Sequence, residues 1–492
     1  MELAAELEAS LREFAATGSA ELRENGGRLA PFTGLSWEVR GSGDKPLLHI
    51  WSEQYNLTRR VLGITNHSDD RLTLAVERFG RSKPDRLELV RTDFERPARQ
   101  LSREEFAERL KNILATQFPD EGLESITVAA DLEHSLSGNY ARGILRRGSV
   151  RTPFLAVPDG ESAETLHNSL TFLLLWNDRV CASNLRGTIG GPRLLLPKNA
   201  GGTVAHRCLA IDPKVGLELF ERDAARETLE KINPRHAGNV ESSLVRWRDS
   251  EMLLDLARPE VGSIVSLSPQ AISVHPVPAS GEVWLRFRGL GFGYWDEGRV
   301  FYGIGDQRTE LSKATRPGFA RLLHDLEVFR HPLASDTRHT LYRAQPERWL
   351  ESIVRADVSR IDPLLNPRYV YPQVVARAGG DHGILDLLTV TRAGRLAILE
   401  LKASEHIHLP LQAADYWLHV RRHLESGNLQ ASGYFPGLKL QALPPLIYLV
   451  APALRFHPSS EILQRYVAKE MQFERVGVTE SWRRGLRVVM RH

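Results

Sequence analysis

The chain has 492 residues, of which 42% are hydrophobic and 25% are charged, and its formal net charge is +3. This composition is typical of a soluble globular protein, and the length predicts two or three domains because one hydrophobic core seldom organises so many residues. The longest strongly apolar run, Leu170 to Trp176, is far too short to span a bilayer, so no membrane partner is expected.

Two further features of the sequence bear on where the protein works. Its N-terminus is acidic and amphipathic, and it lacks the basic start and the apolar core of a signal peptide. Cys181 and Cys208 are the only cysteines, which is too few for a disulfide framework, and they do not have metal-ligand spacing. A reducing cytoplasm is therefore the expected location.

The first 153 residues are predicted to form an α+β domain. Helical structure is expected up to about residue 30. From Leu35 to about Phe94, apolar stretches separated by Gly, Asn, Asp and Pro predict four or five antiparallel strands. A capping-box pattern at Ser102 then predicts a helix that ends at about Gln117.

A basic cluster follows this helix. It has two interpretations: a path for a nucleic-acid backbone, helped by backbone N–H groups near Gly143 and Gly148, or a solvated edge strand protected by its charge. The cluster consists of Arg142, Arg146, Arg147 and Arg151.

Residues 154–335 are predicted to be a mixed α/β region. A glycine-punctuated loop is expected from Leu185 to Gly202, but no G-x-x-x-x-G-K-[ST] motif occurs, so no nucleotide-triphosphate chemistry is assigned. Strands are expected in three stretches between residues 263 and 304. The expected helices run from Ser162 to Asn177, roughly from Lys214 to Ile232, and from Val240 to Leu256.

Aromatic residues concentrate in the last two of these strand stretches. They are compatible with a stacking platform for unpaired bases, although the core of a β-domain is the commoner explanation for such a run. The residues are Trp284, Phe287, Phe292, Tyr294, Trp295, Phe301 and Tyr302.

Residues 336–492 are predicted to form a separate domain, which follows a polar linker from Pro332 to Thr340. Basic residues outnumber acidic residues in this domain, as in a phosphate-backbone binder attached to another body. The apolar segments Ile384 to Val390 and Leu396 to Leu401 flank a turn and predict a β-hairpin. A helix is predicted from Leu409 to Leu424.

The predicted hairpin brings together charged residues that are far apart in the sequence. Asp386 lies on the first strand, and Glu400 and Lys402 lie two residues apart on one face of the second. Two carboxylates this close repel each other unless a cation lies between them, and a hard divalent ion such as Mg²⁺ removes that penalty. The Lys402 ammonium would then orient an attacking water or stabilise charge on a phosphate. Gln412 and Tyr416 are four residues apart and share one face of the next helix.

This arrangement resembles the signature of the PD-(D/E)XK nuclease superfamily, and it is most similar to the RecB-like branch, which adds a Q-x-x-x-Y helix after the catalytic strand. The resemblance covers roughly the last third of the chain and implies a restriction-endonuclease-like core, a mixed sheet flanked by helices. In this superfamily the Asp and the Glu hold Mg²⁺ or Mn²⁺, the Lys assists the hydrolytic water, and the Gln and the Tyr complete the site. Carried over, these residues are Asp386, Glu400, Lys402, Gln412 and Tyr416.

The superfamily usually has a further acidic residue on a helix before the core sheet. Residues 346–354 form such a predicted helix, and Glu351 is preferred to Glu347 as the additional metal ligand. A leucine precedes Asp386 where the family name suggests a proline, a variation that the superfamily tolerates. His406 and His408 are interpreted as loop residues rather than zinc ligands.

The function implied by the resemblance is a Mg²⁺-dependent deoxyribonuclease that hydrolyses DNA phosphodiester bonds. The first 335 residues would then serve substrate binding or regulation. Two alternatives stay open: a catalytically inactive nucleic-acid-binding protein, and a host-defence effector whose nuclease is switched on by a sensor body, with a protein partner.

Overall fold

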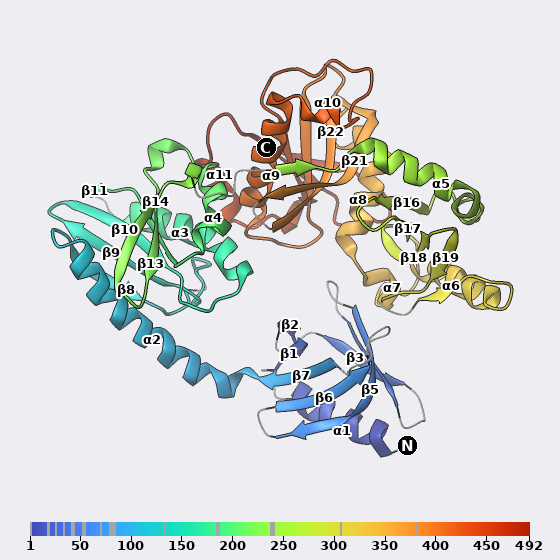
Figure 1. The fold of residues 1–492 in the computed structure, drawn as a ribbon, viewed down its shortest axis with the longest axis horizontal. Helices are drawn as coiled ribbons and strands as arrows, with labels where there is room; N and C mark the ends of the chain where they lie inside the picture. Colours follow the sequence, from blue (N-terminus) through green and yellow to red (C-terminus); the bar gives the residue numbers. More distant parts are fainter. Residues whose placement is uncertain are drawn as a thin grey trace. The chain divides into compact units, whose positions relative to one another are not determined.

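A computed structural model (Figure 1) describes residues 2–16, 20–24, 27–32, 35–40, 45–51, 56–68, 71–77, 85–131, 133–183, 187–236, 242–305, 308–378 and 381–492. Both helices and strands contribute extensively, which confirms the predicted mixed α/β class. The chain divides into two compact units. Met1–Arg99 and Arg248–Ile353 form the first unit, and Gln100–Trp247 and Val354–His492 form the second.

The first unit begins with helix α1 (Glu2–Ala16) and an antiparallel sheet of order β2-β1-β7-β6-β5-β4-β3. Leu7, Leu11 and Phe14 of α1 are fully buried and belong to the core that covers this sheet. The predicted meander is confirmed. The predicted helical structure ends at Ala16 rather than near residue 30, and Ala20–Glu24 pairs with Gly27–Pro31 as strands instead. The strands are β1 (Ala20–Glu24), β2 (Gly27–Pro31), β3 (Ser36–Arg40), β4 (Leu47–Trp51), β5 (Asn56–His67), β6 (Arg71–Glu77) and β7 (Asp85–Arg91).

The second part of this unit contains a five-stranded antiparallel meander, β16 to β20, with its own core. Apolar side chains of helices α5 and α6 belong to that core, among them Val261 and Leu326. The elements are α5 (Trp247–Val265), β16 (Ile272–Val277), β17 (Glu282–Phe287), β18 (Leu290–Asp296), β19 (Arg299–Tyr302), β20 (Thr309–Glu310), α6 (Arg316–Phe329), α7 (Thr340–Arg343) and α8 (Pro346–Ala356).

The side chain of a buried arginine connects the residues that follow α6 to this sheet through hydrogen bonds. Arg330 is 0% exposed, and its guanidinium lies 4.6 Å from the centroid of the Trp349 ring. A buried charge is costly unless its donors are satisfied, and here backbone carbonyl groups accept them. The accepting oxygens belong to Phe287, Arg288, Leu341 and Ala344.

The second unit contains two sheets, and the first has the order β14-β13-β12-β10-β9-β8, with β11 paired to β10. Helices α3 and α4 contact this sheet, and side chains of α2 pack on it through Phe106, Leu110 and Leu114. The elements are α2 (Thr92–Gln117), β8 (Gly122–Thr127), β9 (Ala141–Arg147), β10 (Val150–Ala156), α3 (Ala163–Ser183), β11 (Thr188–Ile189), β12 (Arg193–Pro197), α4 (Gly201–Cys208), β13 (Glu218–Asp223), β14 (Thr228–Ile232) and β15 (Ser242–Leu244).

Three predictions for this region are wrong. The expected helix from Val240 to Leu256 begins only at Trp247, because Ser242–Leu244 form strand β15, which pairs with β21. The expected helix from Lys214 to Ile232 is instead the antiparallel pair β13–β14, and β12 lies inside the expected loop from Leu185 to Gly202. Strand β13 is an inner strand with a core on each face, because Leu219 belongs to one hydrophobic cluster and Phe220 to another. Strands buried on both faces lose the apolar–polar alternation that identifies strands in a sequence.

The last sheet carries the candidate site and has the order β15-β21-β22-β23-β24-β25-β26. Strands β21, β22 and β23 are antiparallel, whereas β23, β24 and β25 are parallel. The parallel connections run through helices α9 and α11. The elements are β21 (Leu365–Ala378), β22 (Asp381–Thr391), β23 (Leu396–Leu401), α9 (Leu409–Glu425), α10 (Asn428–Ala431), β24 (Leu446–Pro452), α11 (Ser459–Tyr466), β25 (Gln472–Val478) and β26 (Val488–Arg491).

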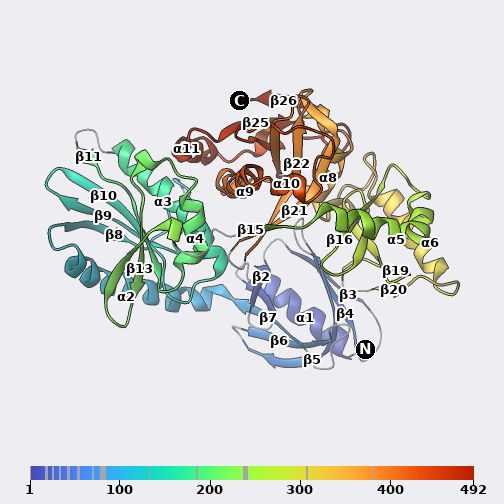
Figure 2. The ribbon, with the colours of Figure 1, turned by 45° about the horizontal axis from the view of Figure 1, so that its top comes forward.

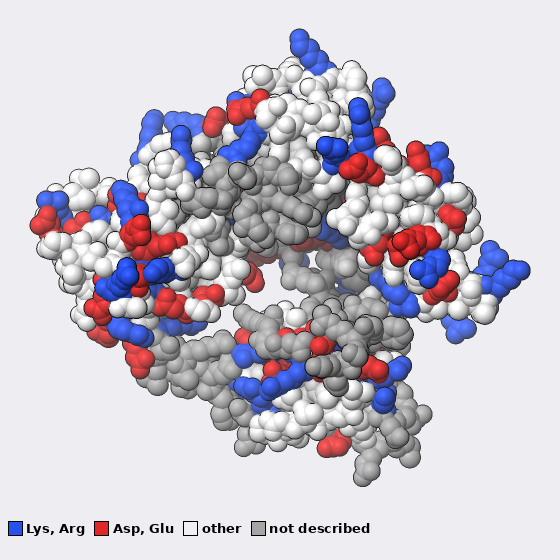
Figure 3. All heavy atoms as spheres, viewed as in Figure 1, with Lys and Arg blue, Asp and Glu red and all other residues white. Residues whose placement is uncertain are grey.

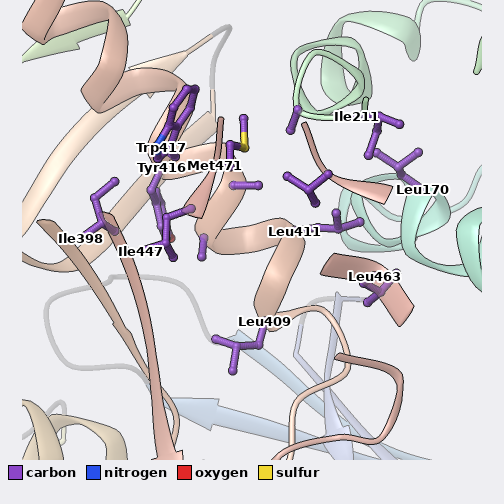
Figure 4. Packing of buried hydrophobic residues seen from close by; sticks show 14 of the residues in the cluster. Leu170, Ile211, Ile398, Leu409, Leu411, Tyr416, Trp417, Ile447, Leu463 and Met471 are labelled. Atoms are coloured by element: carbon purple, nitrogen blue, oxygen red, sulfur yellow. The ribbon is translucent and has the colours of Figure 1, made fainter. Parts of the chain in front are cut away.

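One continuous hydrophobic core joins the two sheets of the second unit. The second unit has two segments, Gln100–Trp247 and Val354–His492. Figure 4 shows part of the core, with Leu170 and Ile211 from the first segment beside Leu411 and Leu463 from the second. Helix α4 contacts α9 and α3 contacts α11, so helices lie between the two sheets (Figure 2). The short β-bridge between Ile211 and Val467 adds a backbone connection. Helix α9 is therefore packed against residues from both segments.

Candidate functional site

The β22–β23 hairpin places Asp386 beside the end of β23. Leu387 pairs with Leu399, so Asp386 and Glu400 are the next positions across the two antiparallel strands. The Leu401 N–H donates a hydrogen bond of 2.9 Å to Asp386 Oδ2. The predicted hairpin is confirmed, and it brings the two acidic residues to neighbouring positions.

Glu400 and Lys402 also lie together, and both are buried. The Lys402 ammonium donates to Glu400 Oε1 at 3.2 Å, and the two residues are 7% and 1% exposed. Side chains alternate between the two faces of a strand, yet every residue of β23 is buried, so both faces of this strand are covered. Strand β23 lies between β22 and β24 in the middle of the sheet, so the buried charge of Glu400 requires a partner of opposite charge, which Lys402 supplies just beyond the strand. Asp386 is half-buried.

Helix α9 adds Gln412 and Tyr416 to this group. Gln412 Nε2 donates to the Tyr416 hydroxyl oxygen at 3.3 Å. Burial raises the pKa of Tyr416, and the negative charges of Glu400 and Asp386 raise it further. The negative charges of both carboxylates therefore act on the Tyr416 hydroxyl group. The five residues predicted from the hairpin and the helix converge on one end of β23.

Glu351 belongs to the first unit, whereas Asp386 and Glu400 belong to the second. Glu351 is 2% exposed, and its Oε2 accepts a hydrogen bond of 2.6 Å from the Arg348 guanidinium of the same unit. Its predicted role as a metal ligand stays a prediction.

The donor set at the end of β23 fits a hard divalent cation. Mg²⁺ commonly binds proteins through one or two carboxylates and completes its shell with water and substrate phosphates. Asp386 and Glu400 supply two carboxylates on neighbouring strands. Within the described parts of the chain, no group of three or more His, Cys, Asp and Glu side chains is arranged to hold a metal ion. Asp386 and Glu400 are therefore the residues of this site that could hold a divalent ion.

Two histidines that follow β23, His406 and His408, are more deeply buried than the sequence indicated. Burial lowers the pKa of His406 to about 4, and the charge of Lys402 contributes to the same shift. Burial likewise lowers the pKa of His408 to about 3, and its Nδ1 lies 2.8 Å from Thr171 Oγ1 on α3. Both imidazoles are neutral at neutral pH, and the spacing of His406 four residues after Lys402 was the only signal of their closeness.

A buried ion pair that the sequence did not suggest joins α9 to α4. Asp415 is 5% exposed and accepts a hydrogen bond from the Arg207 guanidinium of α4. His206 Nε2 lies 3.4 Å from the other carboxylate oxygen. The only sequence signal was an acidic residue between Ala414 and Tyr416.

The basic cluster lies on the β9–β10 hairpin, and its members have local partners. Arg142 is 5% exposed, and its guanidinium lies 5.7 Å from the Trp176 ring centroid. Arg146 donates to the Gly148 carbonyl oxygen, Arg147 pairs with Asp120 at 3.4 Å, and Arg151 pairs with Glu124 at 2.8 Å. On the face drawn in Figure 3, basic and acidic side chains are interspersed over the coloured surface. The predicted role of the basic cluster in nucleic-acid binding stays a prediction.

Comparisons with known proteins add no family to this description. No family model matches the chain, and no curated protein matches it significantly. Among the helices that the structure describes, none is long and apolar enough to cross a membrane.

Proposed function

We propose that the protein is a metal-dependent nuclease that hydrolyses DNA phosphodiester bonds. The observation that carries this proposal is the convergence of Asp386, Glu400 and Lys402 at one end of β23. Two carboxylates with an adjacent ammonium form a site for a divalent cation and a phosphate, and the resemblance to the PD-(D/E)XK signature gives the same reaction.

Each side chain has a defined task in this proposal. Asp386 and Glu400 would hold Mg²⁺ or Mn²⁺, and a bound ion of this kind supplies positive charge for the phosphate and lowers the pKa of a bound water. The Leu401 N–H fixes the Asp386 carboxylate through the 2.9 Å hydrogen bond. The Lys402 ammonium orients the attacking water and stabilises negative charge on the phosphate oxygens. Tyr416, held by Gln412, stays protonated and packs beside the two acids.

The test is cleavage by the purified full-length chain with Mg²⁺ or Mn²⁺. Covalently closed circles, linear duplexes and single strands serve as substrates, because nicking of circles identifies an endonuclease and loss of linear DNA alone identifies an exonuclease. Asp386→Ala and Lys402→Ala should each abolish cleavage while circular dichroism shows a folded chain. Glu405→Ala, which removes an exposed acid three residues beyond Lys402, is the matched control and should cut normally.

A second candidate function is nucleic-acid binding without cleavage. It is favoured by the burial of Glu400 and Lys402, which are 1% and 7% exposed and would need rearrangement to reach a scissile phosphate. In that case DNA would bind with affinity that falls steeply with salt, and no divalent metal would produce turnover. Full cleavage in both Asp386→Ala and Lys402→Ala would contradict the assignment of the reaction to the site on β23.

A further inference from the structure

The β16–β20 sheet has two chemically different faces. Val283, Leu285 and Phe287 of β17 are fully buried and form one face with the core that α5 and α6 complete. Side chains alternate along a strand, so Trp284 and Arg286 project to the other face. Trp284, Tyr294 and Phe301 are only partly buried on that face. The structure thus divides the aromatic run between a core and an outer surface.

The three outer aromatic residues form a continuous row across three strands. Trp284 pairs with Tyr294, and Tyr294 pairs with Phe301. Their ring centroids are 5.5 Å and 5.0 Å apart, and the Tyr294 and Phe301 rings are stacked at 17°. We call these residues the aromatic row.

Two contacts fix the Trp284 indole at the end of the row. Its Nε1–H donates to Glu282 Oε2 at 2.9 Å. Its ring lies against Gly291, where an added Cβ would be 3.4 Å from the indole Cε3. A glycine at this position leaves room for the indole to lie over the neighbouring strand.

Arginine side chains flank the aromatic row. The Arg308 guanidinium lies 5.4 Å from the Trp284 ring centroid, and the Arg299 guanidinium lies 5.5 Å from that of Phe301. Acidic residues also border the row: Glu282 accepts from Trp284, Asp296 is the strand partner of Arg299, and Glu310 is the strand partner of Phe301. The face therefore combines flat apolar surfaces with cations at both ends.

We propose that the aromatic row is a docking surface for the unpaired bases of a single-stranded nucleic acid. Every base has a flat face, so stacked aromatic side chains bind single strands with little sequence preference. A base can insert between an aromatic ring and the arginine that lies over it. The guanidinium then stacks on the base instead of the ring and lies near the flanking phosphates. An uncharged sugar would gain the aromatic contact but nothing from the two guanidinium groups. This binding does not rest on the nuclease proposal, because cleavage is not needed to observe it.

The test is fluorescence anisotropy of a labelled oligothymidine with the full-length protein in EDTA, which prevents metal-dependent cleavage. Tyr294→Phe keeps the ring, whereas Tyr294→Thr removes it and retains a side chain favoured in strands. We expect Tyr294→Thr to weaken binding about tenfold or more and Tyr294→Phe to bind as the unchanged protein does. Arg299→Gln should also weaken binding, whereas Arg316→Gln, which removes an exposed charge at the start of α6, should not.

Two results would overturn the proposal. One is equal affinity of Tyr294→Thr and Tyr294→Phe for the oligothymidine, with both variants folded by circular dichroism. The other is binding of neutral oligosaccharides that depends on Tyr294 while the oligothymidine does not bind. An Asp386→Ala protein that fails to cut DNA but binds the oligothymidine normally would separate this surface from the site on β23.

Discussion

The Arg207 guanidinium donates a hydrogen bond to Asp415, the residue that directly precedes Tyr416 on α9. A second nitrogen of Arg207 donates to the His167 carbonyl oxygen at 2.8 Å, which anchors the arginine to α3 as well. The catalytic helix of the proposed nuclease is therefore held by residues more than 200 positions earlier in the chain.

Removal of one partner of this buried pair should destabilise the second unit strongly. Arg207→Met leaves the Asp415 carboxylate buried without its cation, so we expect a loss of about 3–5 kcal/mol in the free energy of unfolding, measured by urea denaturation. Arg465→Met is the control, because it breaks the Arg465–Asp178 pair between the same two segments with an arginine that is 65% exposed. Such surface pairs contribute about 1 kcal/mol or less. Equal costs for the two variants would contradict the assigned importance of the buried pair.

Acid should destabilise the second unit through its buried histidines. Burial lowers the pKa of His419 to about 4 from its ordinary 6.5, and the neighbouring His206 contributes to the same shift, while Asp415 opposes it. Between pH 6.5 and about 4 the unfolded chain binds a proton that the folded chain does not. The free energy of unfolding should therefore fall as the pH drops through this window, by at most about 1.4 kcal/mol per pH unit for each such histidine.

Urea titrations at several pH values measure this dependence. His419→Gln should reduce the slope of the unfolding free energy against pH between pH 4 and 6.5. Above pH 6.5 the slopes of the variant and the unchanged protein should be the same. A slope that is identical in the two proteins between pH 4 and 6.5 would contradict the prediction.

Gly143 should not tolerate a side chain. A Cβ at this position of β9 would lie 2.2 Å from the Ser125 carbonyl oxygen and 2.6 Å from Phe154 Cζ. We expect Gly143→Ala to lower the free energy of unfolding by about 1–3 kcal/mol or more, because neither the paired strand nor the buried ring can move away easily. Gly122→Ala on β8 is the matched control. Its Cβ would meet only the Arg146 carbonyl oxygen, at 3.9 Å, so its melting temperature should change little.

The two cysteines should differ in reactivity. Cys208 is buried, and burial together with the charge of Asp415 raises the pKa of its thiol to about 12. Cys181 is exposed, although partial burial also raises its pKa. Because the thiolate is the reactive form, iodoacetamide at pH 8 should label Cys181 slowly and Cys208 only after denaturation. Mass spectrometry of native Cys181→Ser should then find no modified cysteine.

The sequence was most informative where local signals agree with tertiary structure. The turn between residues 391 and 395 and its flanking apolar segments predicted the β22–β23 hairpin, and the spacing of Gln412 and Tyr416 placed both on one face of α9. These are short-range patterns, so a single sequence contains them. The antiparallel register then follows from the turn and brings Asp386 to Glu400.

The predictions from the sequence fail where both faces of an element are buried. Strand β13 lacks alternation because Leu219 and Phe220 are buried on opposite sides, so the sequence pattern there predicts a helix. The burial of Glu400 depends on β24, which the chain adds about 50 residues later. Nor can a local pattern show that Asp415 finds its cation at Arg207. Partner choice across such distances depends on the assembled fold.

The core shared by the two segments of the second unit has a consequence for synthesis of the chain. Residues 100–247 leave the ribosome before Arg248–Ile353, and only afterwards does the segment that covers Leu170 and Ile211 emerge. At about 5–20 residues per second, this delay lasts on the order of 5 to 20 seconds. During this delay the apolar surface of residues 100–247 is therefore exposed to solvent, and we expect chaperones to bind it.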